Sequence, residues 1–195
     1  MRHAFRSAVV LGTALSLAGC LGLGGKTPKS LLTLTPSATA PAGSVASGNA
    51  QSAIAISEFA APQKLDVTRV PVQVSDSEIA YVKDAVWNEK PARLLGRLIA
   101  ETIRSKSDRL IVDGDDPGAL ADTRISGTLR EMGYDARTGE VLVVLDAAKA
   151  GAGSSVTTKR FEARVPNVVA EAGPVGAALN QAANQVAGEV AAWVG

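Results

Sequence analysis

The sequence has very few of the side chains on which most hydrolases and metalloenzymes depend. Its 195 residues include one histidine, His3, and one cysteine, Cys20, both within the first 20 positions. If those positions are processed, the remaining chain has no imidazole for a Ser-His-Asp or Cys-His relay and no His or Cys ligand for a catalytic zinc. We therefore expect a protein that binds and is not an enzyme, with no cofactor and no metal.

Aromatic residues and net charge are also scarce. Aromatic residues make up 4% of the chain, which leaves little surface for stacking nucleobases. The 20 basic and 19 acidic residues nearly cancel, so the charge balance does not favour nucleic acid as a partner. The length and the apolar fraction of 46% are typical of one compact domain with a processed end.

The first 20 residues are typical of a bacterial lipoprotein signal. Arg2 and Arg6 give a positive region before a short apolar segment, residues 8–18, that is too short to span a bilayer. The segment ends in Leu17-Ala18-Gly19-Cys20, which has the pattern of a lipobox. We expect residues 1–19 to be removed by cleavage between Gly19 and Cys20, and Cys20 to carry acyl chains as a membrane anchor. The alternative is an ordinary secretory signal with a chance cysteine.

The residue after the anchor indicates which membrane receives the protein. Removal of residues 1–19 takes away Arg2 and Arg6, so the mature chain has 18 basic and 19 acidic residues and a net charge of −1. No polybasic patch supplements the lipid. Leu21 stands where an aspartate retains lipoproteins at the inner membrane of enteric bacteria. We expect the periplasmic side of the outer membrane, and the inner membrane stays open as an alternative.

Residues 20–50 are expected to form a lipidated N-terminus with a short strand and a flexible tether. Residues 31–36, Leu-Leu-Thr-Leu-Thr-Pro, predict a short strand that pairs with the domain at an edge. Residues 37–50 consist of Ser, Ala, Thr, Gly, Pro, Val and Asn without charge, which predicts a spacer with a root-mean-square reach of about 20 Å. The folded periplasmic domain is expected over residues 51–195.

The hydrophobic pattern of this domain changes period along the chain. Period-two or short apolar segments predict strands at residues 53–59, 70–74, 78–83, 109–112, 124–134, 141–145 and 156–165. A break in phase predicts a bulge near Glu131. Helical periodicity follows Asn88, a candidate N-cap, and Gly173-Pro174. We expect an α+β fold, with one antiparallel sheet and two amphipathic helices packed on one face.

Two charged clusters invite a binding interpretation. Asp113, Asp115 and Asp116 resemble the start of a calcium loop, but the twelfth position of that loop is Arg124, where an EF-hand needs glutamate. We therefore interpret the stretch as an Asx-type turn. A second cluster lies on the outer face of the first helix, where Glu89 is expected to pair with the first of three arginines. This cluster predicts a solvated face, with an anionic headgroup surface as the alternative; its arginines are Arg93, Arg97 and Arg104.

Five further residues are candidates for a role. Tyr81, Trp87 and Trp193 could pack the helix ends on the sheet or lie at a partner interface, where tryptophan is enriched. Glu131 and Asp135 are the pair that a carboxylate-based hydrolase would need. No helix or strand pattern brings these two carboxylates into a common pocket, so we expect no catalytic residues.

Several segments, in order and spacing, resemble one protein family. They are the lipobox, Leu32-Thr-Leu34-Thr-Pro36, Leu65-Asp-Val-Thr-Arg69-Val70-Pro-Val72, Ile79-Ala-Tyr81, Ala85-Val-Trp87, the Leu-rich helix after Pro91, Ala177-Ala-Leu-x-x-Ala182 and Glu189-Val-Ala-Ala-Trp193-Val. Together they resemble the ABC-type transport auxiliary lipoproteins of the PqiC/YmbA kind. The chain departs from that pattern at Leu31 or Leu32, where the family usually has tyrosine, and in the short segment between Val112 and Thr123.

The resemblance implies a membrane-anchored accessory lipoprotein that faces the periplasm. Its implied partners are an MCE-family periplasmic protein and the permease and ATPase subunits of an ABC transporter. Such a transporter moves phospholipids or other hydrophobic substrates between the inner and outer membranes. The alternative function is that of an outer-membrane assembly lipoprotein in lipopolysaccharide or β-barrel biogenesis. Self-association into a homo-oligomer is left open.

Overall fold

The structure is a computed structural model that describes residues 30–118, 120–151, 153 and 155–195. The expected signal peptide, its cleavage site at Gly19 and the lipidation site Cys20 lie outside the described residues. None of the helices in the described part of the chain is both long and apolar enough to cross a membrane.

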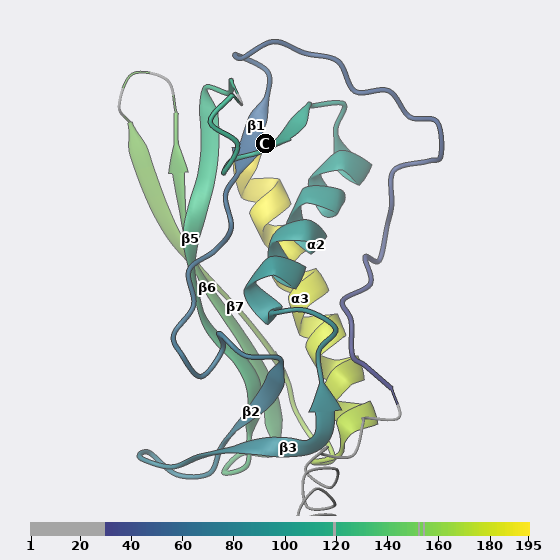
Figure 1. Cartoon of the computed structure of the whole chain (residues 1–195), viewed down its shortest axis with the longest axis vertical. Helices are drawn as coiled ribbons and strands as arrows, with labels where there is room; N and C mark the ends of the chain where they lie inside the picture. The colour runs from purple at the N-terminus through teal and green to yellow at the C-terminus, as the bar shows by residue number, and fades with distance from the viewer. Residues whose placement is uncertain (1–29, 119, 152, 154) are drawn as a thin grey trace, which may run out of the picture.

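Seven strands of the described chain form one sheet around a long central strand, β5 (Figure 1). One edge of β5 pairs antiparallel with β6, which pairs antiparallel with β7. The other edge pairs in parallel with β1 near Thr123 and with β2 near Asp135. The strands are β1 (Ile54–Ile56), β2 (Arg69–Gln73), β3 (Ile79–Val86), β4 (Ile111–Asp113), β5 (Thr123–Asp135), β6 (Glu140–Ala150) and β7 (Val156–Val165).

The expectation of a purely antiparallel sheet is wrong. The β2–β3 hairpin and the β5–β6–β7 meander are antiparallel, but β1 pairs in parallel with both β4 and β5, and β2 pairs in parallel with β5. The physical reason is the length of the connections: β1 and β4 are joined through the β2–β3 hairpin and helix α2 (Pro91–Lys106), and β2 and β5 through β3, α2 and β4. Tight turns join antiparallel strands, whereas parallel pairing needs long connections such as these. The sheet is therefore mixed, within an α+β fold.

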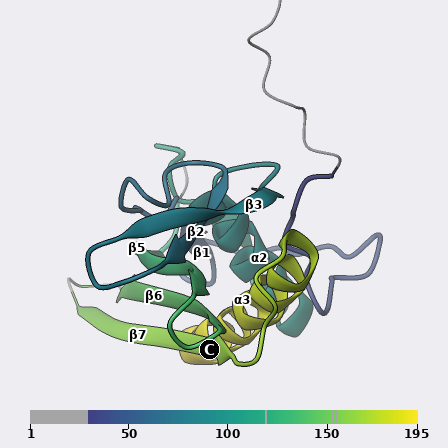
Figure 2. The same cartoon turned by 90° about the horizontal axis from the view of Figure 1, so that it is seen from below.

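Two helices lie on the same face of this sheet (Figures 1 and 2). Helix α2 (Pro91–Lys106) has Lys90 at its N-cap with no side-chain cap, so the prediction of an Asn88 cap is wrong. Pro91 sets the start of α2, because proline fits the first helical turn, where no backbone donor is needed. Helix α3 (Ala172–Val194) covers β6 and β7, and α2 packs against α3.

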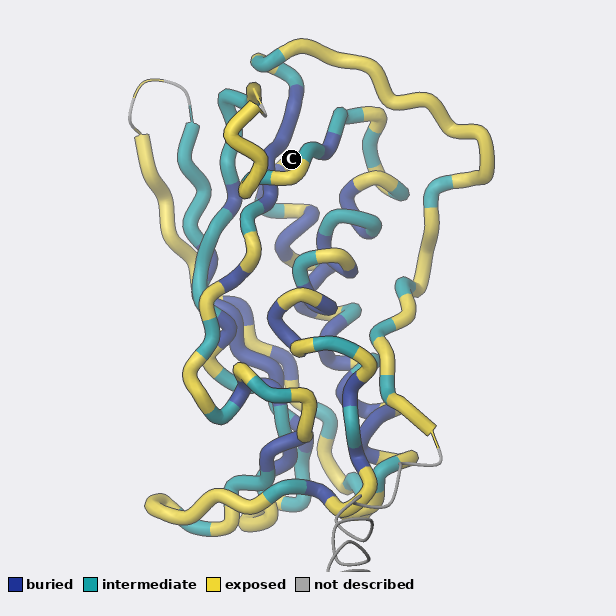
Figure 3. Tube along the Cα trace, viewed as in Figure 1, coloured by how far each residue is buried: buried dark blue, intermediate teal, exposed yellow. Residues whose placement is uncertain are grey.

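The core lies between the helices and the inner face of the sheet, as the buried stretches in Figure 3 show. The apolar face of α3 is buried, including Val175, Leu179 and Val186. The pairing of β5 with β6 shifts between Leu129 and Glu131, which confirms the predicted bulge. The extra residue restores the inward phase of the strand, so that the side chains on both sides of the bulge reach the same core.

Candidate functional site

Residues 32–37, here called the strap, precede the first strand and run from the end of β3 along α3. The Leu32 amide donates to the Val86 carbonyl at 2.7 Å, and the Asn88 amide donates to the Leu32 carbonyl at 2.9 Å. These bonds form a parallel bridge between Leu32 and Trp87, just beyond the edge strand β3. The predicted edge pairing is confirmed at this one residue, and the rest of the strap follows the helices.

Two asparagines of α3 hold the strap by its backbone. The Thr35 amide donates to Asn180 Oδ1 at 2.8 Å, and the Ser37 amide donates to Asn184 Oδ1 at 2.8 Å. Asn184 Nδ2 in turn donates to the Thr35 carbonyl at 2.9 Å. The sequence places these asparagines opposite the apolar stripe of the helix and does not by itself name a partner for them. Their spacing of four residues, which puts both on one side of the helix, was the signal of a shared partner.

A glycine makes room for the strap at the start of α3. A Cβ atom at Gly176 would lie 2.6 Å from Cδ2 of Leu32, which is shorter than real Cβ contacts allow. The strap leucines pack against the core as partly buried side chains. The strap is therefore part of the folded domain and is held by side chains and backbone together.

The docked strap corrects the interpretation of residues 37–50 as the tether that gives the anchor its reach. The Ala40 amide donates to Glu101 of α2 at 2.9 Å, and the Asp122 amide donates to the Ala50 carbonyl at 2.8 Å. Both ends of residues 37–50 thus lie on the same domain, and the stretch is a surface loop (Figure 1). Its length does not add to the distance between Cys20 and the domain.

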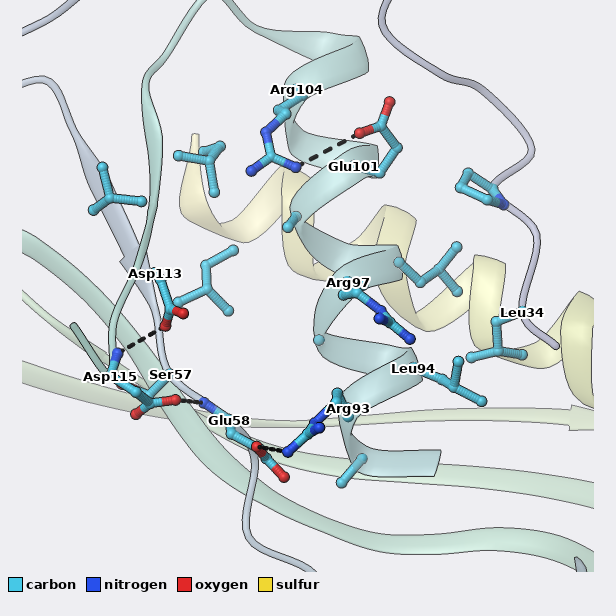
Figure 4. Close-up of a pocket in the computed structure, with 18 of the residues that line it drawn as sticks. Leu34, Ser57, Glu58, Arg93, Leu94, Arg97, Glu101, Arg104, Asp113 and Asp115 are labelled. Carbon is cyan, nitrogen blue, oxygen red and sulfur yellow. Dashed lines mark hydrogen bonds and ion pairs between the residues drawn. The ribbon is translucent and has the colours of Figure 1, made fainter. Parts of the chain in front are cut away.

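A groove of about 810 Å³ runs along the outer side of α2, between the strap and the ends of β1 and β4 (Figure 4). We call it the α2 groove. Its apolar lining comes from the strap, the helix and the two short strands, and includes Leu34, Pro36, Ile56, Leu94, Leu98, Ala100, Ile111 and Val112. Charged side chains stand at its rim.

The rim charges of the α2 groove are paired. Arg93 binds Glu58 at 3.1 Å, Arg97 binds Glu89 at 2.6 Å, and Arg104 Nη1 lies 3.6 Å from Glu101. The predicted pair of Glu89 with Arg93 is therefore wrong. Glu58 is 35 residues from Arg93 in the chain, and only the fold brings them together. Because each arginine has a glutamate beside it, the cluster offers an anionic headgroup little uncompensated positive charge.

The acidic turn after β4 forms local hydrogen bonds. Asp113 Oδ1 accepts from the Asp115 amide at 2.9 Å, and Asp116 Oδ1 accepts from the Gly118 amide at 2.8 Å, as in the predicted Asx turns. Asp115 Oδ2 accepts from the Glu58 amide at 2.7 Å and so fixes the wall of the α2 groove. In the described ranges, no three metal-ligating side chains gather.

The three aromatic candidates lie in different surroundings. Trp87 is buried in the core, and its Nε1 has no hydrogen-bond partner among the described residues. Trp193 is partly buried, packs edge-on against Phe161 with ring centroids 5.5 Å apart, and lies beneath the ammonium of Lys149. Tyr81 is half-buried on the β2–β3 hairpin, with the Arg69 guanidinium 3.8 Å above its ring. The structure does not bring these three side chains together.

The two candidate carboxylates do line one cavity, of about 310 Å³, over β5 beside β2. The expectation that they would not share a pocket is wrong, because the bulge between Leu129 and Glu131 restarts the alternation and turns both outward. Lys64 Nζ lies 2.6 Å from Glu131. Hydrogen bonds from Arg137 lower the pKa of Asp135 to about 2. Asp135 therefore stays ionised at neutral pH and does not supply the protonated carboxyl that acid–base hydrolysis needs.

A comparison with protein families decides the identity of the chain. The family described as the ABC-type transport auxiliary lipoprotein component matches residues 32–191, from the first residue of the strap into the last turn of α3. The chain belongs to this family. It is a family of auxiliary transport components and not a known enzyme family. No curated protein matches the chain.

Solved structures share the fold of this family member. A protein from Xanthomonas campestris, assigned to the DUF330 family, has a TM-score of 0.64 at 17% identity and covers 85% of this chain and 91% of its own. The crystal structure of an uncharacterized protein has a TM-score of 0.64 at 15% identity, with coverage of 73% of this chain and 92% of its own. At such identities the likeness extends to the fold alone.

Proposed function

We propose that this family member is a lipid-anchored, non-enzymatic auxiliary subunit of an MCE-type ABC transporter. The observation that carries the proposal is the family match over residues 32–191, which includes the strap, α2, most of α3 and all seven described strands. The transporter would move phospholipids or other hydrophobic substrates between the inner and outer membranes. The chain would act in the periplasm through its binding surfaces, without a cofactor.

The anchor of this subunit is Cys20, at the end of the lipobox. It stands twelve positions before Leu32, where the docked strap begins. We place the anchored protein at the periplasmic side of the outer membrane, because Leu21 is not the aspartate that retains lipoproteins at the inner membrane of enteric bacteria. Several acyl chains on one residue suffice for stable anchoring without a membrane-spanning helix.

The α2 groove is the surface that we assign to the MCE-family subunit. It combines an apolar lining with paired charges at its rim, which is the usual arrangement of a protein interface. The permease and ATPase subunits would associate with the chain through that MCE subunit. The lining is built from the strap, α2, β1 and β4, so a partner in the groove would contact the segment that leads to the anchor.

Purification of native complexes from membranes tests both parts of this proposal. Ala100 lines the α2 groove, whereas Ala192 is exposed on α3 outside it. We expect wild-type protein and Ala192→Trp to recover MCE and ABC subunits, and Ala100→Trp to lose them because the indole fills the groove. Absence of these subunits from the wild-type complex would contradict the transporter function. Their retention by a folded Ala100→Trp protein would contradict only the choice of the groove.

A further inference from the structure

One end of the domain exposes several large aliphatic side chains. Leu31 is 54% exposed, Val74 37%, Ile79 44% and Val169 60%. We call this the anchor end, because the chain that leads to Cys20 leaves the domain there at Leu31. Val45, Leu120 and Val156 are also exposed and lie outside the anchor end, so exposure alone does not select this end. What selects it is its position next to the chain that leads to Cys20.

Hydrogen bonds join the segments that carry these side chains. Val74 and Ile79 lie at the turn of the β2–β3 hairpin, where the Val74 amide donates to the Glu78 carbonyl at 3.0 Å. The Ala136 amide, in the β5–β6 turn, donates to Gln73 at 2.9 Å, and the Val168 amide donates to Gly139 of the same turn at 2.9 Å. Hairpin, turn and the β7–α3 connection thus form one end of the molecule (Figures 1 and 2).

The strap fixes this end as the one nearest the anchor. Leu32 bonds to Val86 and Asn88 and fills the space above Gly176, near the start of α3. From Cys20 to Leu31 the chain has eleven peptide units, which span at most about 40 Å. The 13 residues of β5 alone extend over roughly 43 Å. The opposite end of the sheet could therefore face the membrane only with the linking chain almost fully stretched.

We propose that the anchor end rests on the bilayer into which Cys20 is acylated, with Leu31, Val74, Ile79 and Val169 in contact with the lipid interface. The inference rests on the proposed lipid anchor and adds the orientation of the domain. Aliphatic side chains on a surface segment enter the boundary between headgroups and acyl chains to about 5–10 Å. Arg137 binds both Asp76 and Asp135, so part of the negative charge beside these side chains is compensated.

The chain offers a matched control at the opposite end. Val156 is 61% exposed. It pairs with Ala150 of β6, which in turn pairs with Arg124 at the start of β5. The anchor end lies at the other terminus of the same strand, where Asp135 pairs with Gln73. Val156 and Val169 thus have the same side chain and nearly the same exposure, and they differ in the end of the sheet at which they lie.

Site-specific fluorescent labels test the inference. Cys20 is the one cysteine of the sequence and is consumed by the lipid, so an introduced thiol is unique in the mature protein. Full-length acylated Ile79→Cys, Val169→Cys and Val156→Cys proteins, each labelled with NBD, are inserted in vesicles of phosphatidylethanolamine and phosphatidylglycerol. We expect doxyl-labelled phospholipid to reduce NBD emission at positions 79 and 169 about two-fold or more, and to leave position 156 unchanged.

Flotation of the same vesicles distinguishes a failure of the proposed orientation from a failure of the proposed lipid anchor. If the proteins float with the vesicles and positions 79, 169 and 156 respond alike, the orientation is overturned while the anchor stands. If the wild-type protein does not float, the lipid anchor and the proposed function fail together. The thermal transition of each labelled protein verifies its fold, and Val74→Cys provides an independent position if one variant does not fold.

Discussion

At the scale of single residues, the asparagines of α3 act as substitutes for a neighbouring strand. Asn184 offers both halves of its amide: the oxygen accepts from Ser37 and the nitrogen donates to Thr35. This is the pattern that a backbone peptide group presents in a sheet. The strap therefore satisfies its backbone groups on a helix, where no strand is available to pair with it.

Replacement of Asn184 by alanine is expected to loosen the strap without unfolding the domain. It removes two hydrogen bonds to the strap, and each contributes about 0.5–1.5 kcal/mol net. Amide exchange within residues 32–37 should therefore accelerate roughly five-fold to 150-fold, because each 1.4 kcal/mol is a factor of ten in the opening equilibrium. Hydrogen exchange read by mass spectrometry measures this.

The control for this experiment is Gln181→Ala. Gln181 is exposed on the same helix and makes no side-chain hydrogen bond within the described chain. Equal exchange rates for the strap in both variants would show that the asparagine bonds do not hold it. A shift in the exchange of β5 and β6 in the Asn184 variant would indicate a global effect on the fold.

At the scale of elements, the outer face of the meander is held by charges that cross the strands. Asp146 of β6 accepts from Arg160 of β7 at 2.6 and 2.8 Å and from Arg130 of β5 at 2.9 Å. The hydrogen bond from Arg160, followed by that from Arg130, lowers the pKa of Asp146 to about 2. Charged pairs directly opposite each other on neighbouring strands stabilise a sheet modestly.

The lowered pKa of Asp146 predicts a pH dependence of stability. The unfolded carboxyl has an ordinary pKa of about 3.9, so the folded state favours the ionised form and gains stability above that value. This contribution is lost as the pH falls from about 4 to about 2. Asp146→Asn should therefore reduce the slope of unfolding free energy against pH in this window, measured by urea denaturation at successive pH values.

Asp116→Asn removes one negative charge from a turn in which the carboxylate accepts from the Gly118 amide and forms no ion pair with the residues that the structure describes. It serves as the control for the change in net charge. An Asp146→Asn protein whose stability falls with pH as steeply as that of the control would contradict the role of the Arg160 and Arg130 bonds.

Helices, strands and the bulge could be predicted where they depend on the spacing of residues along one segment. The pairing of strands that lie far apart in the chain could not be predicted in this way. The helical stripes, the Val156–Val165 strand and the bulge near Glu131 depend on the spacing of apolar residues along one segment. The parallel attachment of β1 and β2 to one edge of β5 depends on contacts between segments about 60 to 70 residues apart. The pairing of Arg93 with Glu58 and the docking of the strap on Asn180 have the same origin.

At the scale of the whole molecule, the proposed anchor and the fold together define how the domain is oriented on the membrane. The strap leaves the domain at the anchor end, and the α2 groove lies along the side of the same strap. The loop of residues 37–50, which the sequence pattern favoured as the tether, begins and ends on the domain. A membrane at the anchor end therefore leaves the α2 groove accessible from the side. The outer face of the meander is turned away from the groove.

Affinity for the membrane and orientation on it should then have separate causes. With the proposed anchor, the acyl chains on Cys20 supply the affinity, at about 0.8 kcal/mol for each buried methylene, and stable attachment needs more than one chain. The side chains at the anchor end are too few to replace them.

Cys20→Ala is therefore expected to move the protein from the membrane fraction to the aqueous fraction, measured by sedimentation of membranes and immunoblotting. An Ile79→Asp, Val169→Asp protein with Cys20 intact should stay with the membranes. Retention of the Cys20→Ala protein after a high-salt wash would contradict the assignment of Cys20 as the anchor.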